Sequence, residues 1–225
     1  MVDSWLTGLL DDASARIEPA KITENGLLGS VVVPDDRLAA VDRGLDGPDP
    51  VPCRVINTGG AGGLLALSRR RFERLRVTGV RTGLRDLDDL AGAAARVAVA
   101  ARELDPDLLV MIEIPDAPGW QRAVETAELE GLSAAVRDDG DPAPRLEALI
   151  EADVPFVITG PVGTADRVVE LIMIIAGIVD GTVPADGPPD PDQGRRIRRR
   201  LLGIEVESPA AVAQQLADRG WPLDH

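Results

Sequence analysis

Residues 108–137, LLVMIEIPDAPGWQRAVETAELEGLSAAVR, contain one complete strand–helix–strand unit. The apolar run Leu108–Ile114 predicts a strand that is covered on both faces. Pro118–Glu130 has the length of a helix and begins with a proline, which a first turn tolerates. Leu132–Arg137 predicts the next strand. Elements in this order form a parallel unit with a right-handed crossover.

The same alternation runs through most of the chain. Four more apolar runs predict strands at Gly29–Val33, Cys53–Asn57, Arg76–Val80 and Val154–Thr159. Further helices are predicted at Asp35–Arg43, Gly62–Leu75, Asp86–Leu104, Pro144–Ala152, Ala165–Val179, Arg195–Leu202 and Ser208–Arg219. Alternating strands and helices of this kind predict an α/β protein with a parallel sheet.

Two architectures fit this order of elements. One is a (β/α) barrel-like fold with parallel strands, complete or short of eight units, and the other is an open doubly wound parallel sheet. No G-x-G-x-x-G follows the first strand, which removes the usual dinucleotide argument for the open sheet, so we favour the barrel. We expect residues 1–225 to form a single domain, with 181–194 as a surface loop and 195–225 as a C-terminal helical closure.

Charge and hydropathy narrow the range of partners. The net charge of −14 argues against a nucleic-acid partner and against binding to anionic membranes. We interpret the basic run Arg195–Arg200, which follows an acidic loop, as a solvated helix face or a partner of carboxylates. The apolar run Leu171–Val179 is far shorter than the ~20 residues that span a bilayer, and the N-terminus has no basic export signal. We therefore expect a cytoplasmic protein, and Val168–Val179 is either deeply buried or the interface of a homo-oligomer.

Polar residues and glycines stand where the predicted strands end. In both architectures ligands bind beyond the carboxyl ends of the strands. The candidate substrate-binding residues at these ends are Asn57, Thr58, Gly59, Gly60, Arg81, Arg137, Thr159 and Gly160, and the candidate catalytic residues are Glu113 and Asp116. Glycine-rich turns such as Thr58–Gly63 allow backbone N–H groups to approach an anion, and the alternative is a tight turn that needs positive φ.

The charged candidates suggest a site for a small anion. Arg81 and Arg137 each end a strand, where a guanidinium binds a carboxylate or phosphate with two hydrogen bonds; the alternative is that they pair with Glu113 or Asp116. Glu113 lies between two isoleucines, which indicates either a buried, paired acid or a functional one. Together with Asp116 it would offer oxygen ligands to Mg²⁺, and no other cofactor is indicated.

Missing residue types exclude several chemistries. The only histidine is His225, the last residue, so a Ser–His–Asp or Cys–His nucleophile has no internal histidine to activate it. The only lysine, Lys21, precedes the first predicted strand, which argues against Schiff-base chemistry. The single cysteine, Cys53, opens an apolar run and is expected to be a buried thiol.

Five segments carry a resemblance to a known family. The segments DDASARIEP, SVVVPDDRL, INTGGAGGLLAL, VMIEIPDAPGWQRAVETAELEGLSAAVRDDG and VPFVITG together resemble an uncharacterised bacterial (β/α)-barrel-like family with no assigned activity. The resemblance implies the barrel and no particular reaction. It also implies lysines at the positions of Ala135 and Val157 and a histidine pair at Gly163 and Thr164, all of which this chain lacks.

Two functions follow from these residues. The first is an enzyme, such as a lyase or isomerase, acting on a small anionic metabolite with a carboxylate or phosphate group. The second is a non-catalytic binding or oligomeric scaffold protein that kept the barrel and lost its catalytic residues.

Overall fold

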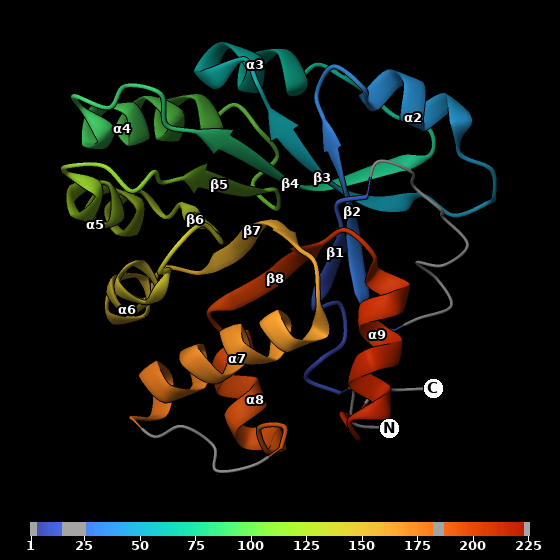
Figure 1. Cartoon of the computed structure of the whole chain (residues 1–225). Helices are drawn as coiled ribbons and strands as arrows, with labels where there is room; N and C mark the ends of the chain where they lie inside the picture. The colour runs from blue at the N-terminus through green and yellow to red at the C-terminus, as the bar shows by residue number, and fades with distance from the viewer. Residues whose placement is uncertain (1–3, 15–25, 182–186, 223–225) are drawn as a thin grey trace.

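The structure is a computed structural model of the chain, and it describes residues 4–14, 26–181 and 187–222. Within these ranges eight parallel strands form a closed barrel in the order of the sequence (Figure 1). The strands are β1 (Leu10–Asp12), β2 (Leu28–Pro34), β3 (Val51–Asn57), β4 (Leu75–Gly83), β5 (Leu109–Glu113), β6 (Ser133–Arg137), β7 (Phe156–Val162) and β8 (Leu201–Val206). The helices are α2 (Leu38–Gly44), α3 (Gly60–Leu67), α4 (Leu90–Ala101), α5 (Trp120–Glu130), α6 (Ala143–Glu151), α7 (Ala165–Asp180), α8 (Pro191–Arg198) and α9 (Pro209–Asp218).

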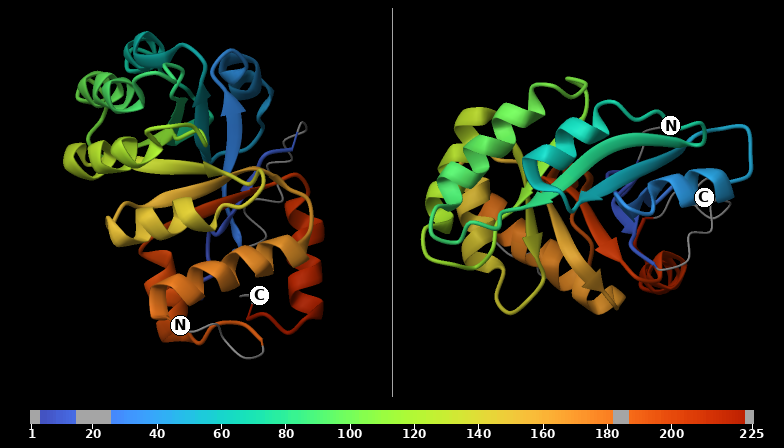
Figure 2. Two further views of the ribbon diagram at one scale, coloured as in Figure 1. Left: turned by 60° about the vertical axis from the view of Figure 1, so that its left-hand side comes forward. Right: turned by 90° about the horizontal axis from the view of Figure 1, so that it is seen from above.

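The predicted (β/α) barrel is confirmed, and the alternative of an open sheet is wrong. The barrel closes because β1 pairs with both β2 and β8, with Asp11 opposite Ser30 on one side and opposite Glu205 on the other. The helices lie outside the strands and cover them (Figure 2). The strand–helix unit at 108–137 is present as β5, α5 and β6.

The sequence patterns miss the two strands that close the barrel. Residues 195–202 were expected to be helical, but α8 runs from Pro191 to Arg198 and β8 begins at Leu201. The C-terminal segment is therefore α8, β8 and α9 rather than a helical closure alone, and the expected surface loop 181–194 already contains the first turn of α8. Neither β1 nor β8 is a continuous apolar run, because Asp11 and Glu205 are buried within them.

The core has two separate parts. The larger part lies between the strands and the helices, and it includes Leu171, Ile172 and Ile175 of α7, which are fully buried. The smaller part consists of Met111, Ala135 and Val157, with Leu202 packed against it. The Cys53 thiol is buried as expected, and burial raises its pKa to about 12.

Arginines of the basic run pair with nearby carboxylates. Arg196 Nε lies 2.8 Å from Asp180, and Arg195 and Arg200 pair with Asp192 and Asp153. These contacts agree with the interpretation of the run as a partner of carboxylates. Among the described helices none is long and apolar enough to cross a membrane.

Gly203 offers a test of how the interior is packed. A Cβ atom there would lie 2.5 Å from Asp11 Oδ2 and 2.7 Å from Arg54 Nη1, so we expect Gly203→Ala to lower the free energy of unfolding by about 1–3 kcal/mol. Gly62→Ala in α3 is the control, because a Cβ there meets no atom within 4 Å, and we expect it to stabilise the protein by about 0.5–1 kcal/mol. Urea unfolding measures both. Equal stability of the two variants would contradict the packing of β8 against the Asp11–Arg54 pair.

Candidate functional site

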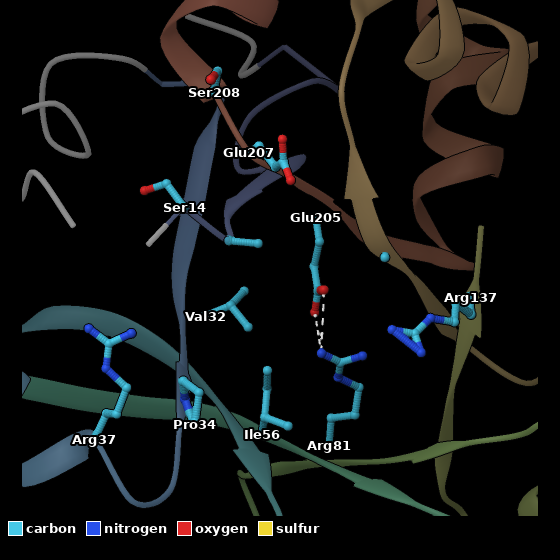
Figure 3. Close-up of a pocket in the computed structure, with 12 residues that line it drawn as sticks. Ser14, Val32, Pro34, Arg37, Ile56, Arg81, Arg137, Glu205, Glu207 and Ser208 are labelled. Atoms are coloured by element: carbon cyan, nitrogen blue, oxygen red, sulfur yellow. Dashed lines mark hydrogen bonds and ion pairs between the residues drawn. The ribbon is translucent and has the colours of Figure 1, made fainter. Parts of the chain in front are cut away.

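The carboxyl ends of the strands surround a pocket of about 610 Å³, which we call the mouth pocket. Val32, Pro34 and Ile56 form an apolar wall. The remaining lining residues are Ala13, Ser14, Arg37, Arg81, Arg137, Gly160, Glu205, Glu207 and Ser208. Figure 3 shows Arg37 and Arg137 on opposite sides of the pocket, with Arg81 and Glu205 between them. Barrel proteins bind ligands at this end of the strands.

Arg81 is held between two carboxylates. Its Nη1 donates a hydrogen bond to Glu113 Oε2 over 2.8 Å, and its Nη2 lies 3.2 Å from Glu205 Oε1. Arg81 is 8% exposed and Glu205 is 5% exposed, so this contact is almost dry. Because two acids compensate its charge, Arg81 serves mainly to hold Glu205 and Glu113 in place.

Arg137 and Arg37 carry the accessible positive charge of the pocket. The Arg137 side chain is 55% exposed and touches acids only loosely, at 3.9 Å from both Glu113 and Asp139. Arg37 is exposed and forms no ion pair with another described residue. A guanidinium in this state binds a carboxylate or phosphate without first losing a close partner.

Glu205 is the buried acid of the pocket. Burial is the largest influence on its pKa and raises it, and the nearby Glu113 carboxylate raises it further. Arg81 and the Gly160 N–H lower the pKa, but the net shift is upward. Strand β7 has a bulge next to Glu205. Ile158 pairs with Ile204 and Val162 pairs with Val206, so three residues of β7, 159–161, lie opposite the single residue Glu205 of β8. Gly160 has a φ of +83° in this bulge, a conformation that glycine adopts without strain.

Beside Glu205 the barrel contains a second acid–arginine pair, formed by Asp11 and Arg54. Asp11 Oδ2 accepts a hydrogen bond of 2.5 Å from Arg54 Nη1, and Arg54 Nη2 donates to the Leu202 carbonyl over 3.0 Å. Complete burial raises the pKa of Asp11 to about 7; Arg54 opposes this rise, and Glu205 adds to it. Asp11 and Glu205 are register partners across β1 and β8, so each carboxylate disfavours ionisation of the other.

The structure brings some of the expected site residues together. Arg81, Arg137 and Gly160 line the mouth pocket, and Glu113 contacts it through Arg81. Thr159 is fully buried beside Gly160, and its hydroxyl has no hydrogen-bond partner among the described residues.

The glycine-rich turn uses its polar groups internally. Asn57 Nδ2 donates to the Gly60 carbonyl over 2.7 Å and to the Thr82 hydroxyl over 2.9 Å, while its Oδ1 accepts the Gly59 N–H. Thr58 donates its N–H and its hydroxyl to Asp35. Gly60 has a φ of +60°, as the tight-turn alternative requires, and none of residues 57–60 lines the mouth pocket. Their binding role therefore stays a prediction without support from the geometry of the pocket.

The expected metal ligands are not arranged as a metal site. Asp116 is exposed in the loop after β5 and does not line the mouth pocket, whereas Glu113 faces Arg81. Across the part of the chain that the structure describes, no three His, Cys, Asp or Glu side chains are placed to hold one ion. Lys21 and His225 lie outside the described residues.

Three important interior residues were missed by the sequence patterns: Asp11, Arg54 and Glu205. A signal exists for two of them, because Arg54 interrupts a short apolar run in PCRVIN and Glu205 in LLGIEV, as Glu113 does in VMIEIP, whereas Asp11 only ends the run in LLDD. In a narrow barrel such a charge points inward and needs a partner on another strand.

Comparison of the sequence with known proteins does not identify a family for this chain. No protein-family model matches the chain, and no curated protein matches its sequence. The resemblance to an uncharacterised barrel family therefore stays a prediction.

The raised pKa of Asp11 predicts an unusual dependence of stability on pH. Between its ordinary pKa of 3.8 and about 7, folded Asp11 keeps a proton that the unfolded chain has released. Protonated Asp11 therefore stabilises the folded protein at low pH, and this contribution is lost as the pH rises. The free energy of unfolding should fall by about 2–3 kcal/mol between pH 5 and 8. We expect urea unfolding to show this decrease in the native protein and a much smaller one in Asp11→Asn.

Asp42→Asn is the control for this experiment. Although burial opposes the shift, backbone N–H groups of Arg74, Glu73 and Leu75 lower the pKa of Asp42, so it titrates below this pH range. The variant should keep the native slope between pH 5 and 8 despite any loss of stability. An unchanged slope in Asp11→Asn would show that Asp11 does not hold the proton.

Proposed function

We propose that the mouth pocket binds a small anionic metabolite and that Glu205 exchanges a proton with it, as in a lyase or isomerase. The single observation that carries the proposal is a buried carboxyl of raised pKa, Glu205, in a pocket whose accessible cations are Arg37 and Arg137. A carboxyl with a raised pKa is suited to acid–base work near neutral pH. Glu113, on the other side of Arg81, is the second candidate acid.

In this proposal each side chain has a separate task. Arg137 and Arg37 hold the carboxylate or phosphate of the ligand, and the apolar wall of Val32, Pro34 and Ile56 takes its carbon skeleton. Arg81 Nη2 lies 3.2 and 3.4 Å from the two carboxylate oxygens of Glu205 and so fixes the carboxyl group in the lining of the pocket. Glu205 then removes a proton from the carbon next to the ligand's carboxylate. In an isomerase the protonated Glu205 returns this proton to a different carbon. In a lyase the electron pair of the broken C–H bond forms a double bond and expels the group on the neighbouring carbon.

A second candidate function, binding without catalysis, is favoured by the interior beneath the pocket. Ala135 and Val157, where the family resemblance implies lysines, lie in the small apolar cluster with Met111. A member of that family whose reaction depended on these lysines would be inactive. The pocket would then serve to bind or carry the anion.

Ligand binding is the first test. We expect carboxylated or phosphorylated metabolites of fewer than about ten carbons to raise the melting temperature, and calorimetry to show Arg137→Ala weakening the best ligand by about 10- to 100-fold, the effect of losing one charged hydrogen-bonding partner. Arg122→Ala is the matched control, because Arg122 is an exposed arginine on α5 outside the mouth pocket. Equal losses in the two variants, or no binding across the set, would reject the anion site.

Proton exchange separates catalysis from binding. In D₂O an enzyme of this kind incorporates deuterium at the ligand carbon from which the proton is taken, which NMR detects without knowledge of the product. We expect exchange in the native protein and a loss of at least 100-fold in Glu205→Gln, with ligand affinity within about threefold. A ligand that binds but shows no exchange in the native protein would favour the non-catalytic function.

A further inference from the structure

A second hollow lies on the outer surface, between α3 and α4. It has a volume of about 700 Å³ and is lined by Ala61 and Leu65 of α3 and by Ala95, Val99 and Ala100 of α4. Leu65 is 41% exposed and Val99 61% exposed. We call this hollow the α3–α4 groove, and Figure 1 shows its two helices side by side.

The groove concentrates apolar surface on a strongly acidic chain. Five large hydrophobic residues are exposed in the described ranges, and two of them, Leu65 and Val99, line the groove, whereas Leu87, Leu109 and Leu129 lie outside it. Single exposed hydrophobic side chains are ordinary, whereas a hollow lined by them indicates a contact surface. The chain carries a net charge of −14, so an apolar hollow on its surface stands out against a largely charged exterior.

The charges along α4 indicate what covers the groove. Arg96, Val99 and Ala100 follow one another at the i, i+3 and i+4 spacing of one helix face, and Glu103 lies in the turn directly after the end of α4 at Ala101. If a second α4 lies antiparallel on the first, with the two-fold axis between Val99 and Ala100, Arg96 of each copy stands opposite Glu103 of the other. Within the described chain Glu103 has no basic partner, and Arg96 forms only surface pairs with Asp86 and Asp89, at 2.9 and 3.8 Å.

We propose that the α3–α4 groove is the two-fold interface of a homodimer. Val99 of each copy lies in the groove of the other, and the small side chains of Ala61 and Ala95 leave room for it. Such an interface is self-complementary, as two-fold symmetry requires. It buries a modest apolar area between two acidic molecules, so the dimer is weak and depends on protein concentration. This inference does not depend on the function of the mouth pocket.

Sedimentation equilibrium between about 1 and 200 µM tests the dimer directly. We expect a monomer–dimer equilibrium in the native protein, and at least a tenfold rise of the dimer Kd in Val99→Glu and in Leu65→Glu. Ala211→Glu is the control for added negative charge, because Ala211 is exposed on α9, which follows β8 across the barrel from β4. Circular dichroism establishes that each variant is folded. A native protein that stays monomeric at 200 µM, or a dimer unchanged in both groove variants, would overturn the proposal.

Charge reversal tests the antiparallel arrangement itself. Arg96→Glu and Glu103→Arg should each weaken the dimer, because each places two like charges opposite one another at both ends of the interface. The double variant restores opposite charges and should recover most of the native affinity. A double variant as weak as the singles would exclude this arrangement, and a groove that instead binds an unrelated protein would leave the native chain monomeric.

Discussion

The charge pair of Asp11 and Arg54 occupies the middle of the barrel, where aliphatic side chains fill most proteins of this architecture. Its hydrogen bonds join β1 to β3 and, through the Leu202 carbonyl, to β8, which are the strands around the point of closure. An unpaired buried charge costs several kcal/mol, so the Arg54 guanidinium without Asp11 would destabilise the closed barrel. The pair also explains Gly203, whose missing side chain leaves room for both groups. Glu205 stands directly across from Asp11, so the electrostatics of the mouth pocket depend on the same pair.

This constraint explains which parts of the fold are predictable from the sequence. The apolar runs of β5 and β6 predict these strands to within one or two residues. β1 and β8 carry a carboxylate toward the interior, so their sequences resemble loop or helix ends more than buried strands. Identifying them needs the partner strand, and a pattern within one segment does not contain that information.

The residues of the mouth pocket also fall into those that the sequence predicts and those that it does not. Arg81, Arg137 and Gly160 were predictable because each stands where an apolar run ends, and parallel strands bring such ends to one mouth. Glu205 was not, since its strand was missed. The turn at Thr58–Gly63 shows a different limit: its glycines fit both an anion cradle and a tight turn, and only the contacts of Asn57 and Asp35 show that its polar groups are already used.

The apolar cluster beneath the pocket bears on both candidate functions. Met111, Ala135 and Val157 fill the side of the interior formed by β5, β6 and β7, and Glu205 lies at its border on β8. Burial is the largest cause of the raised pKa of Glu205, so this dry surrounding is what suits the carboxyl to proton transfer. A lysine at position 135 or 157 would place a positive charge in the same interior and lower that pKa. Ala135 and Val157 thus keep this part of the interior uncharged, which favours the raised pKa of Glu205.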